Sequence, residues 1–177
     1  MNHHSPRVVL DRAGERFRPA RSLERALDEF AAAVMRASTL DPLTTELVRL
    51  RCAQVHDCRL CGSLRLRDAV DVGFDETMTA KIARYETSDL GAAAIAALRL
   101  CDSIILAPAV VADGALAVEL HRHFTDEQIA EICLDVVKWS RQKLLVALRL
   151  ESPRSDELTS LSFDEHGDAV IGRPAYP

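Results

Sequence analysis

Apolar side chains recur three and four residues apart along most of this 177-residue chain, which is the spacing of one face of an α-helix. Between Ser22 and Ala37 this face consists of Leu23, Ala26, Leu27, Phe30, Ala33 and Val34. Thr125 and Gln128 occupy the positions of a capping box and open a helix that we expect to reach about Leu150. Aromatic residues make up only 5% of the chain, which also favours helix over strand. The sequence therefore predicts an all-α bundle of about six or seven helices.

Capping residues divide this pattern into separate helices. Asp41-Pro42 is a typical N-cap and first position of a helix, which His56-Asp57 ends. We expect Asp57 to cap a further helix that runs from Cys58 to about Val72, and Gly73 to end that helix.

The chain divides into an irregular N-terminal segment, a helical domain and a C-terminal extension, at residues 1–20, 21–152 and 153–177. Within the extension, the apolar runs 161–163 and 169–171 flank a turn that contains Gly167, which predicts a β-hairpin. Two strands alone are marginally stable in water, so we expect the hairpin to pack on the helical domain or on a neighbouring subunit.

Charge and composition exclude several classes of protein. The formal net charge of −5 argues against general binding to nucleic acids or to anionic membranes. No apolar run approaches the roughly 20 residues of a membrane helix, and the N-terminus lacks an apolar signal core. We therefore expect a cytoplasmic protein. Its 5 cysteines are an odd number and do not suggest a secreted disulfide framework.

The sharpest motif is Cys58-Arg59-Leu60-Cys61. Residues three apart lie on one face of a helix, so the two sulfurs can approach and form a disulfide. The partial positive charge at a helix N-terminus favours the thiolate, which is the form that attacks a peroxide or a disulfide. Two alternatives remain open, a pair of structural cysteines and half of a zinc site. The zinc site lacks a second Cys or His pair at suitable spacing, and we expect neither a metal nor a cofactor.

The other cysteines and charges near the motif have ordinary explanations. Cys52, Cys101 and Cys133 lie in apolar helical stripes, and we expect them to pack in the core. The arginines that crowd the motif could favour thiolates, attract an anionic substrate or form a solvated surface; they are Arg49, Arg51, Arg59, Arg65 and Arg67.

The stretch from Glu46 to Cys61 resembles the signature of the alkylhydroperoxidase D-like branch of the carboxymuconolactone decarboxylase superfamily. The order of later segments is also similar, with Gly73-Phe74-Asp75, the Ala-rich helix after Asp89, and His123–Ile129. The likeness covers roughly residues 22–150. It implies an all-α fold and a homo-oligomer, a trimer or hexamer rather than a dimer.

The resemblance also implies an activity, that of a thiol-dependent peroxidase or disulfide oxidoreductase acting on a small peroxide or disulfide. In this reading Cys61 attacks the substrate, Cys58 resolves the intermediate and Glu46 handles a proton. A cellular dithiol or a lipoylated protein would then regenerate the pair.

One position departs from the family pattern, which places a histidine four residues after the second cysteine. This chain has Arg65 there, and arginine stays protonated in proteins, so it cannot relay a proton. We expect Arg65 to share a helical face with the cysteines and to form an ion pair with Glu46 or hold an anion; alternatively its side chain reaches solvent. His56 could take over the proton transfer, or it is an ordinary solvent-facing histidine.

The lost histidine leaves two other functions open. The chain could be a non-catalytic or redox-sensing oligomer of the same fold. It could also be a cofactor-free lyase like the decarboxylase branch, in which the cysteines are incidental.

Overall fold

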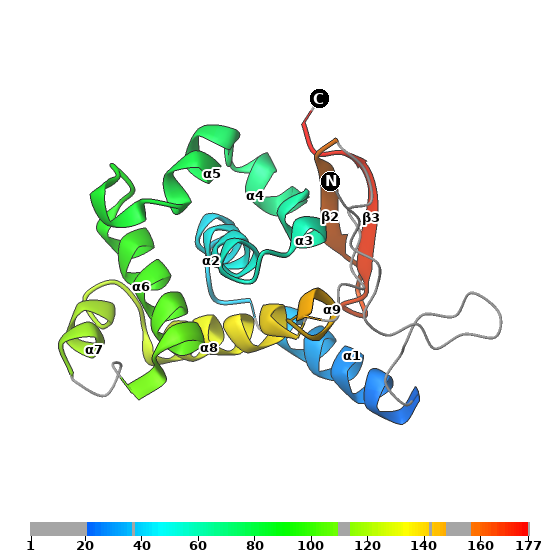
Figure 1. Ribbon diagram of the computed structural model, residues 1–177, viewed down its shortest axis with the longest axis horizontal. Coiled ribbons are helices and arrows are strands. Elements are labelled where there is room, and N and C mark those ends of the chain that lie inside the picture. The colour runs from blue at the N-terminus through cyan, green and yellow to red at the C-terminus, as the bar shows by residue number, and fades with distance from the viewer. Residues whose placement is uncertain (1–20, 37, 110–113, 142, 148–156, 177) are drawn as a thin grey trace.

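The computed structural model describes residues 21–36, 38–109, 114–141, 143–147 and 157–176 (Figure 1). Its larger helices are α1 (Arg21–Arg36), α2 (Pro42–Val55), α5 (Glu76–Ile82), α6 (Ala92–Leu106), α7 (Ala115–Leu120) and α8 (Asp126–Ser140). Shorter helices are α3 (Arg59–Gly62), α4 (Arg67–Asp71) and α9 (Lys143–Ala147). The strands are β1 (Leu64–Leu66), β2 (Thr159–Phe163) and β3 (Ala169–Pro174). The predicted helical fold is confirmed, whereas the segment 1–20 and the expected end of the last long helix near Leu150 lie outside the described residues.

Helix α2 lies at the centre of the molecule, with α6 and α8 on two sides, α3 to α5 arching over it and the sheet beside them (Figure 1). Val48 and Cys52 pack against α6 and α8 in one buried cluster. Leu47 and Leu50 pack against β1, α4 and α5 in a second cluster. Because α2 is covered on several faces, even some of its polar residues, such as Glu46, are buried. Their polar groups therefore require partners inside the protein.

The local capping signals are confirmed at both long helices. Asp41 accepts a hydrogen bond from the Thr44 amide at 2.9 Å at the start of α2. Thr125 and Gln128 form the complete reciprocal capping box at the start of α8. Among the described residues, no helix is both long enough and apolar enough to span a membrane.

The predicted single helix from Cys58 to Val72 is wrong. Residues Leu64–Leu66 leave the helical path and form β1, which pairs in parallel with β2. All three β1 residues are buried, so the gain from pairing and burial outweighs the helix propensity of this leucine-rich stretch. As a consequence, the two cysteines and Arg65 do not share one helical face.

The predicted hairpin is confirmed and extended by one strand. β2 pairs antiparallel with β3 and parallel with β1, so the sheet order is β1-β2-β3. Leu161 is buried, and it packs with Phe163 and Ile171 against the second core cluster. At the turn, a Cβ on Gly167 would lie 2.8 Å from the Ala32 Cα, so the hairpin touches α1 too closely for a larger residue. The extension is thus packed on the helical domain.

Two helix ends share one backbone motif, in which the last turn is closed by hydrogen bonds to the third and fifth preceding carbonyl groups. After α2, Asp57 has a left-handed backbone (φ 54) and the Cys58 amide donates to the Ala53 carbonyl at 2.9 Å. After α4, Gly73 (φ 100) occupies the same position. The left-handed region is strained for any residue with a Cβ, and this strain falls on the residue that precedes Cys58.

We therefore expect opposite effects from matched substitutions at these two positions. Asp57→Gly should raise the free energy of unfolding by about 0.5–1 kcal/mol, because glycine adopts a left-handed backbone without strain. Gly73→Ala should lower it by about 1 kcal/mol, although nothing lies near the added methyl group. Urea unfolding of both variants checks the prediction. A loss of stability in Asp57→Gly would show that the Asp57 side chain contributes more than its backbone strain costs.

Candidate redox site

Cys58 and Cys61 form a disulfide at the start of α3, with their Cα atoms 5.3 Å apart. Cys58 itself is the N-cap of α3, and its sulfur accepts a hydrogen bond from the Cys61 amide at 3.2 Å. The prediction that Asp57 caps this helix is wrong, because Asp57 belongs to the closing turn of α2. The motif therefore begins one residue after a tight helix end, which fixes the position of the first cysteine.

The two sulfur-bearing residues differ in exposure. Cys58 is buried, with 4% of its surface exposed, whereas Cys61 is only partly buried. A reactant from solvent can therefore reach Cys61 more easily than Cys58. Their local hydrogen bonding differs as well, because the Cys58 sulfur is an acceptor for the Cys61 amide. An amide donor stabilises a thiolate more than a thiol.

A buried ion pair lies beneath the dithiol. Arg49 forms a two-pronged pair with Glu46, with its Nε 2.6 Å and its Nη2 2.8 Å from the two carboxylate oxygens. The Arg49 guanidinium also donates to the carbonyl oxygens of Cys61 (2.7 Å) and Leu64 (2.5 Å). Glu46 accepts one more bond, from the Leu66 amide at 3.3 Å. This pair ties the centre of α2 to the end of α3 and to β1.

Arg65 does not pair with Glu46, so that prediction is wrong. β1 directs the buried Arg65 side chain toward Glu76, which it binds with Nε and Nη2 at 2.7 and 2.8 Å. Tyr176, just after β3, donates its hydroxyl to the same carboxylate at 2.8 Å. The alternative that Arg65 reaches solvent is also wrong, since its side chain is only 3% exposed.

Two guanidinium groups therefore cap the carbonyl groups at the end of α3. Arg65 donates to the carbonyl oxygens of Gly62 (2.8 Å) and Leu64 (2.7 Å), and Arg49 donates to those of Cys61 and Leu64. Cations are favourable at the carbonyl end of a helix, and here they also satisfy acceptors that would otherwise be buried without donors. The arrangement holds the segment after the dithiol rigidly in place.

The pair of Arg65 and Glu76 makes stability depend on pH. Hydrogen bonds from Arg65 hold the pKa of Glu76 below its ordinary value of 4.5. A pKa that is lower in the folded state means that the ionised carboxylate stabilises the fold above about pH 4.5. This contribution is then lost as the pH falls through the folded-state pKa.

We expect Glu76→Gln to lower the free energy of unfolding by about 1–2 kcal/mol at neutral pH, because the carboxylate is nearly half exposed. The difference from the wild type should shrink as the pH falls below about 4.5. Urea unfolding at neutral and acidic pH measures both effects. Glu29→Gln, in an exposed pair with Arg25, is the control and should change stability little at either pH. An equal deficit at both pH values would contradict the ionic role of Glu76.

His56 lies at the C-cap of α2, and its ring Nε2 is 3.5 Å from the Ser140 hydroxyl. Burial, together with the charge of Lys143, lowers the pKa of His56 to about 4. The ring is therefore neutral at physiological pH, and its low pKa makes it a weak base. Its hydrogen bond leads to α8 rather than to a sulfur, so a part in the redox chemistry stays a prediction.

The remaining cysteines belong to the core, as predicted. Cys52 and Cys101 are buried between α2 and α6, with their sulfurs 3.6 Å apart. The hydrogen bond between them and their burial raise the pKa of the Cys101 thiol. Cys133 is half-buried against the same cluster. The fully buried thiols of Cys52 and Cys101 should therefore react slowly.

Sequence reasoning missed two residues that hold the site together. Arg49 had a local signal, because residues three apart on α2 face each other and Glu46 is an acidic partner at that spacing. Glu76 had none, because its contact with Arg65 depends on the extended path of β1. The described residues contain no cluster of three or more side chains suited to hold a metal ion.

Comparison with known proteins places the dithiol within a matched region, since residues 21–102 match the carboxymuconolactone decarboxylase family. Uncharacterized proteins from two strains of Mycobacterium tuberculosis are 42% identical over 131 residues, 73% of this chain and 46% of theirs. The chain thus spans about half the length of these curated relatives. An Agrobacterium tumefaciens crystal structure, of a protein of unknown function described as a candidate antioxidant defence protein AhpD, shares the fold. Its TM-score is 0.66 at 17% identity, over 77% of this chain and 94% of that one.

Proposed function

Because this chain belongs to the carboxymuconolactone decarboxylase superfamily, with an alkylhydroperoxidase D-like fold, we propose that Cys58 and Cys61 are the redox centre of a thiol-dependent peroxidase or disulfide oxidoreductase. One observation carries the proposal. The two cysteines are joined by a disulfide at the start of α3, where Cys61 is only partly buried, while the other described cysteines lie in or against the core.

The chemistry with a hydroperoxide follows from the difference in exposure. The Cys61 thiolate attacks the terminal oxygen of the hydroperoxide and the O–O bond breaks, so that Cys61 becomes a sulfenic acid. The leaving alkoxide takes up the proton that the Cys61 thiol released and departs as an alcohol. The Cys58 thiol then attacks the Cys61 sulfur, which forms the disulfide and releases water. An external dithiol reduces the pair and becomes a disulfide itself. A small disulfide substrate would react at Cys61 by direct exchange.

The charges around α3 support this sequence of steps. Arg49 donates to the Cys61 carbonyl oxygen, so its guanidinium places a positive charge against the backbone of the attacking residue. Glu46 is held by Arg49 and the Leu66 amide, so we propose that its main effect on the reaction is to position Arg49. His56, two residues before Cys58 in the chain, is the proposed proton-handling residue. Arg65 takes no part in proton transfer, because it is fully engaged with Glu76 and two carbonyl groups.

The test is a count of free thiols by intact mass after alkylation. Pre-reduced protein should lose two thiols on addition of one equivalent of hydroperoxide, much faster than free cysteine reacts. Repeated turnovers should follow when a dithiol such as dihydrolipoamide is added. Cys52, Cys101 and Cys133 should remain alkylatable after unfolding. Loss of thiols at the rate of free cysteine would overturn the proposal.

A second function is favoured by one observation, the engagement of Arg65 where the family pattern has a relay histidine. The cysteine pair would then be oxidised once by an oxidant, as in a sensor, without efficient catalytic turnover. Two-thiol loss that dihydrolipoamide does not reverse catalytically would favour this redox-sensing function. We further propose a cytoplasmic homo-oligomer, a trimer or hexamer, which sedimentation equilibrium would test.

A further inference from the structure

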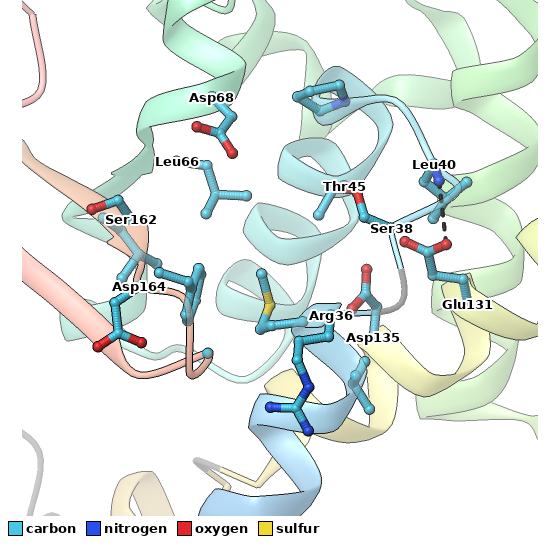
Figure 2. A pocket seen from close by; sticks show the side chains of 16 residues that line it. Arg36, Ser38, Leu40, Thr45, Leu66, Asp68, Glu131, Asp135, Ser162 and Asp164 are labelled. Carbon is cyan, nitrogen blue, oxygen red and sulfur yellow. Dashed lines mark hydrogen bonds between the residues drawn. The ribbon is translucent and has the colours of Figure 1, made fainter.

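A pocket of about 200 Å³ lies between α1, the start of α2, α8 and the sheet. Figure 2 shows Glu131 and Asp135 of α8 on one side of it, with Ser162 and Asp164 on the opposite side. Neither cysteine of the redox pair is among the residues that line it. It is smaller than the roughly 300–1,000 Å³ of sites for drug-sized ligands, so it fits only a small molecule.

Asp135, which lines this pocket, has an unsatisfied carboxylate oxygen. Asp135 is only 2% exposed, and its Oδ1 accepts from the Lys138 ammonium at 2.6 Å. Its other oxygen, Oδ2, is buried and meets no hydrogen-bond donor in the part of the chain that the structure describes. Leaving a buried carboxylate oxygen without a donor is costly, so this atom requires a partner such as a water molecule, an ion or a ligand.

The charge around Asp135 favours a cation. Glu131, one turn earlier on α8, is also buried, and its Oε2 is already occupied by Thr39 and the Leu40 amide. Lys138 neutralises only one of these two carboxylates. The ionisable residues that line the pocket are mostly acidic; they are Arg36, Asp68, Glu131, Asp135 and Asp164. An anionic ligand would be repelled by these carboxylates, whereas an ammonium group would be attracted.

The rest of the pocket is apolar. Met35, Leu66 and Phe163 line it from α1, β1 and β2, opposite or beside the carboxylate. A ligand that fits both parts has one charged donor and a short hydrocarbon body. We propose that this pocket binds a small protonated primary amine, whose ammonium group donates to Asp135 Oδ2. The site is separate from the dithiol and does not depend on the proposed redox function.

Trp139, the only tryptophan in the chain, reports on this pocket. Its ring lies 6.2 Å from that of Phe163, which lines the pocket, and the Lys138 ammonium sits 4.0 Å from its ring centroid. Tryptophan fluorescence should change in a saturable way on titration with n-butylammonium at constant ionic strength. The uncharged isostere 1-butanol should bind at least about tenfold more weakly, because it lacks the charge-assisted hydrogen bond.

Three variants test whether Asp135 binds the ammonium group. Asp135→Asn should weaken butylammonium binding at least about tenfold, whereas Asp71→Asn, an exposed aspartate outside the pocket, should leave it unchanged. Asp135→Asn leaves Lys138 buried without its counter-charge and could fail to fold. In that case Thr45→Leu decides, because it fills the pocket without touching the ion pair and should abolish saturable binding. Equal affinity for 1-butanol, unchanged binding in the folded Asp135→Asn or Thr45→Leu variant, or no saturable response in the wild type would overturn the proposal.

Discussion

Replacing Arg49 with methionine should lower the free energy of unfolding by about 3–5 kcal/mol, the cost of leaving a buried charge without its partner. Glu46 is 0% exposed, and without Arg49 its carboxylate would keep only the long hydrogen bond from the Leu66 amide. The carbonyl groups of Cys61 and Leu64 would lose a donor at the same time. Since domains of this size are stable by only about 5–15 kcal/mol, the loss should be evident in urea unfolding at 25 °C.

Two variants separate the charge effect from the loss of packing. Glu46→Gln/Arg49→Met removes both charges, so it should be less destabilised than Arg49→Met alone, by about 1–3 kcal/mol. Arg67→Met is the matched control, because its pair with Asp71 is exposed and should contribute less than about 1 kcal/mol. A double variant as unstable as the sum of its single variants would mean that Glu46 and Arg49 act independently, which the geometry of the pair contradicts.

Helix boundaries could be predicted from the sequence because their signals are local. A cap is formed by residues three positions apart, as with Thr125 and Gln128 at α8 or Asp41 and Thr44 at α2. Hydrophobic periodicity is local as well, and it placed α1 within one residue of its observed bounds. The hairpin followed from two apolar runs around a glycine turn.

The path after the dithiol could not be predicted, because it depends on a strand almost a hundred residues away. Leu64–Leu66 reads as helix until β2 supplies the partner for its backbone groups. The change of direction moves Arg65 away from Glu46 and toward Glu76 and Tyr176. The choice of ion-pair partner is therefore a tertiary property, and a helical wheel drawn from Cys58 onward assigns it wrongly.

Position 65 shows how one substitution in a family pattern can change the purpose of a residue. By resemblance to the family pattern, a histidine at this place would carry a proton, whereas Arg65 is a fixed cation bound to Glu76. It contributes to the site by capping the Gly62 and Leu64 carbonyl groups beside the dithiol. Any proton transfer must then come from elsewhere, which makes the neutral His56 the residue to test.

Cys61→Ser should slow the reaction with hydroperoxide at least about a hundredfold, the largest effect that we expect on activity. Cys61 is the more exposed member of the pair, so a peroxide can approach it more easily than it can approach Cys58, which is 4% exposed. Cys58→Ser should behave differently. It should consume one equivalent of peroxide at close to the wild-type rate and stop at a sulfenic acid on Cys61, because no second thiol is in place to resolve it.

Intact mass distinguishes these outcomes, since the wild type loses two hydrogen atoms on oxidation and Cys58→Ser gains one oxygen atom. Cys133→Ser removes a half-buried cysteine outside the pair and should react as the wild type does. Rapid gain of oxygen on Cys58 in the Cys61→Ser variant would reverse the roles of the two cysteines. That reversal would require α3 to unfold locally before the reaction. In the structure, the Cys58 sulfur is buried and accepts a hydrogen bond from the Cys61 amide. The rate should then fall in Asp57→Gly, which we expect to stabilise this turn, whereas attack by Cys61 should be insensitive to that substitution.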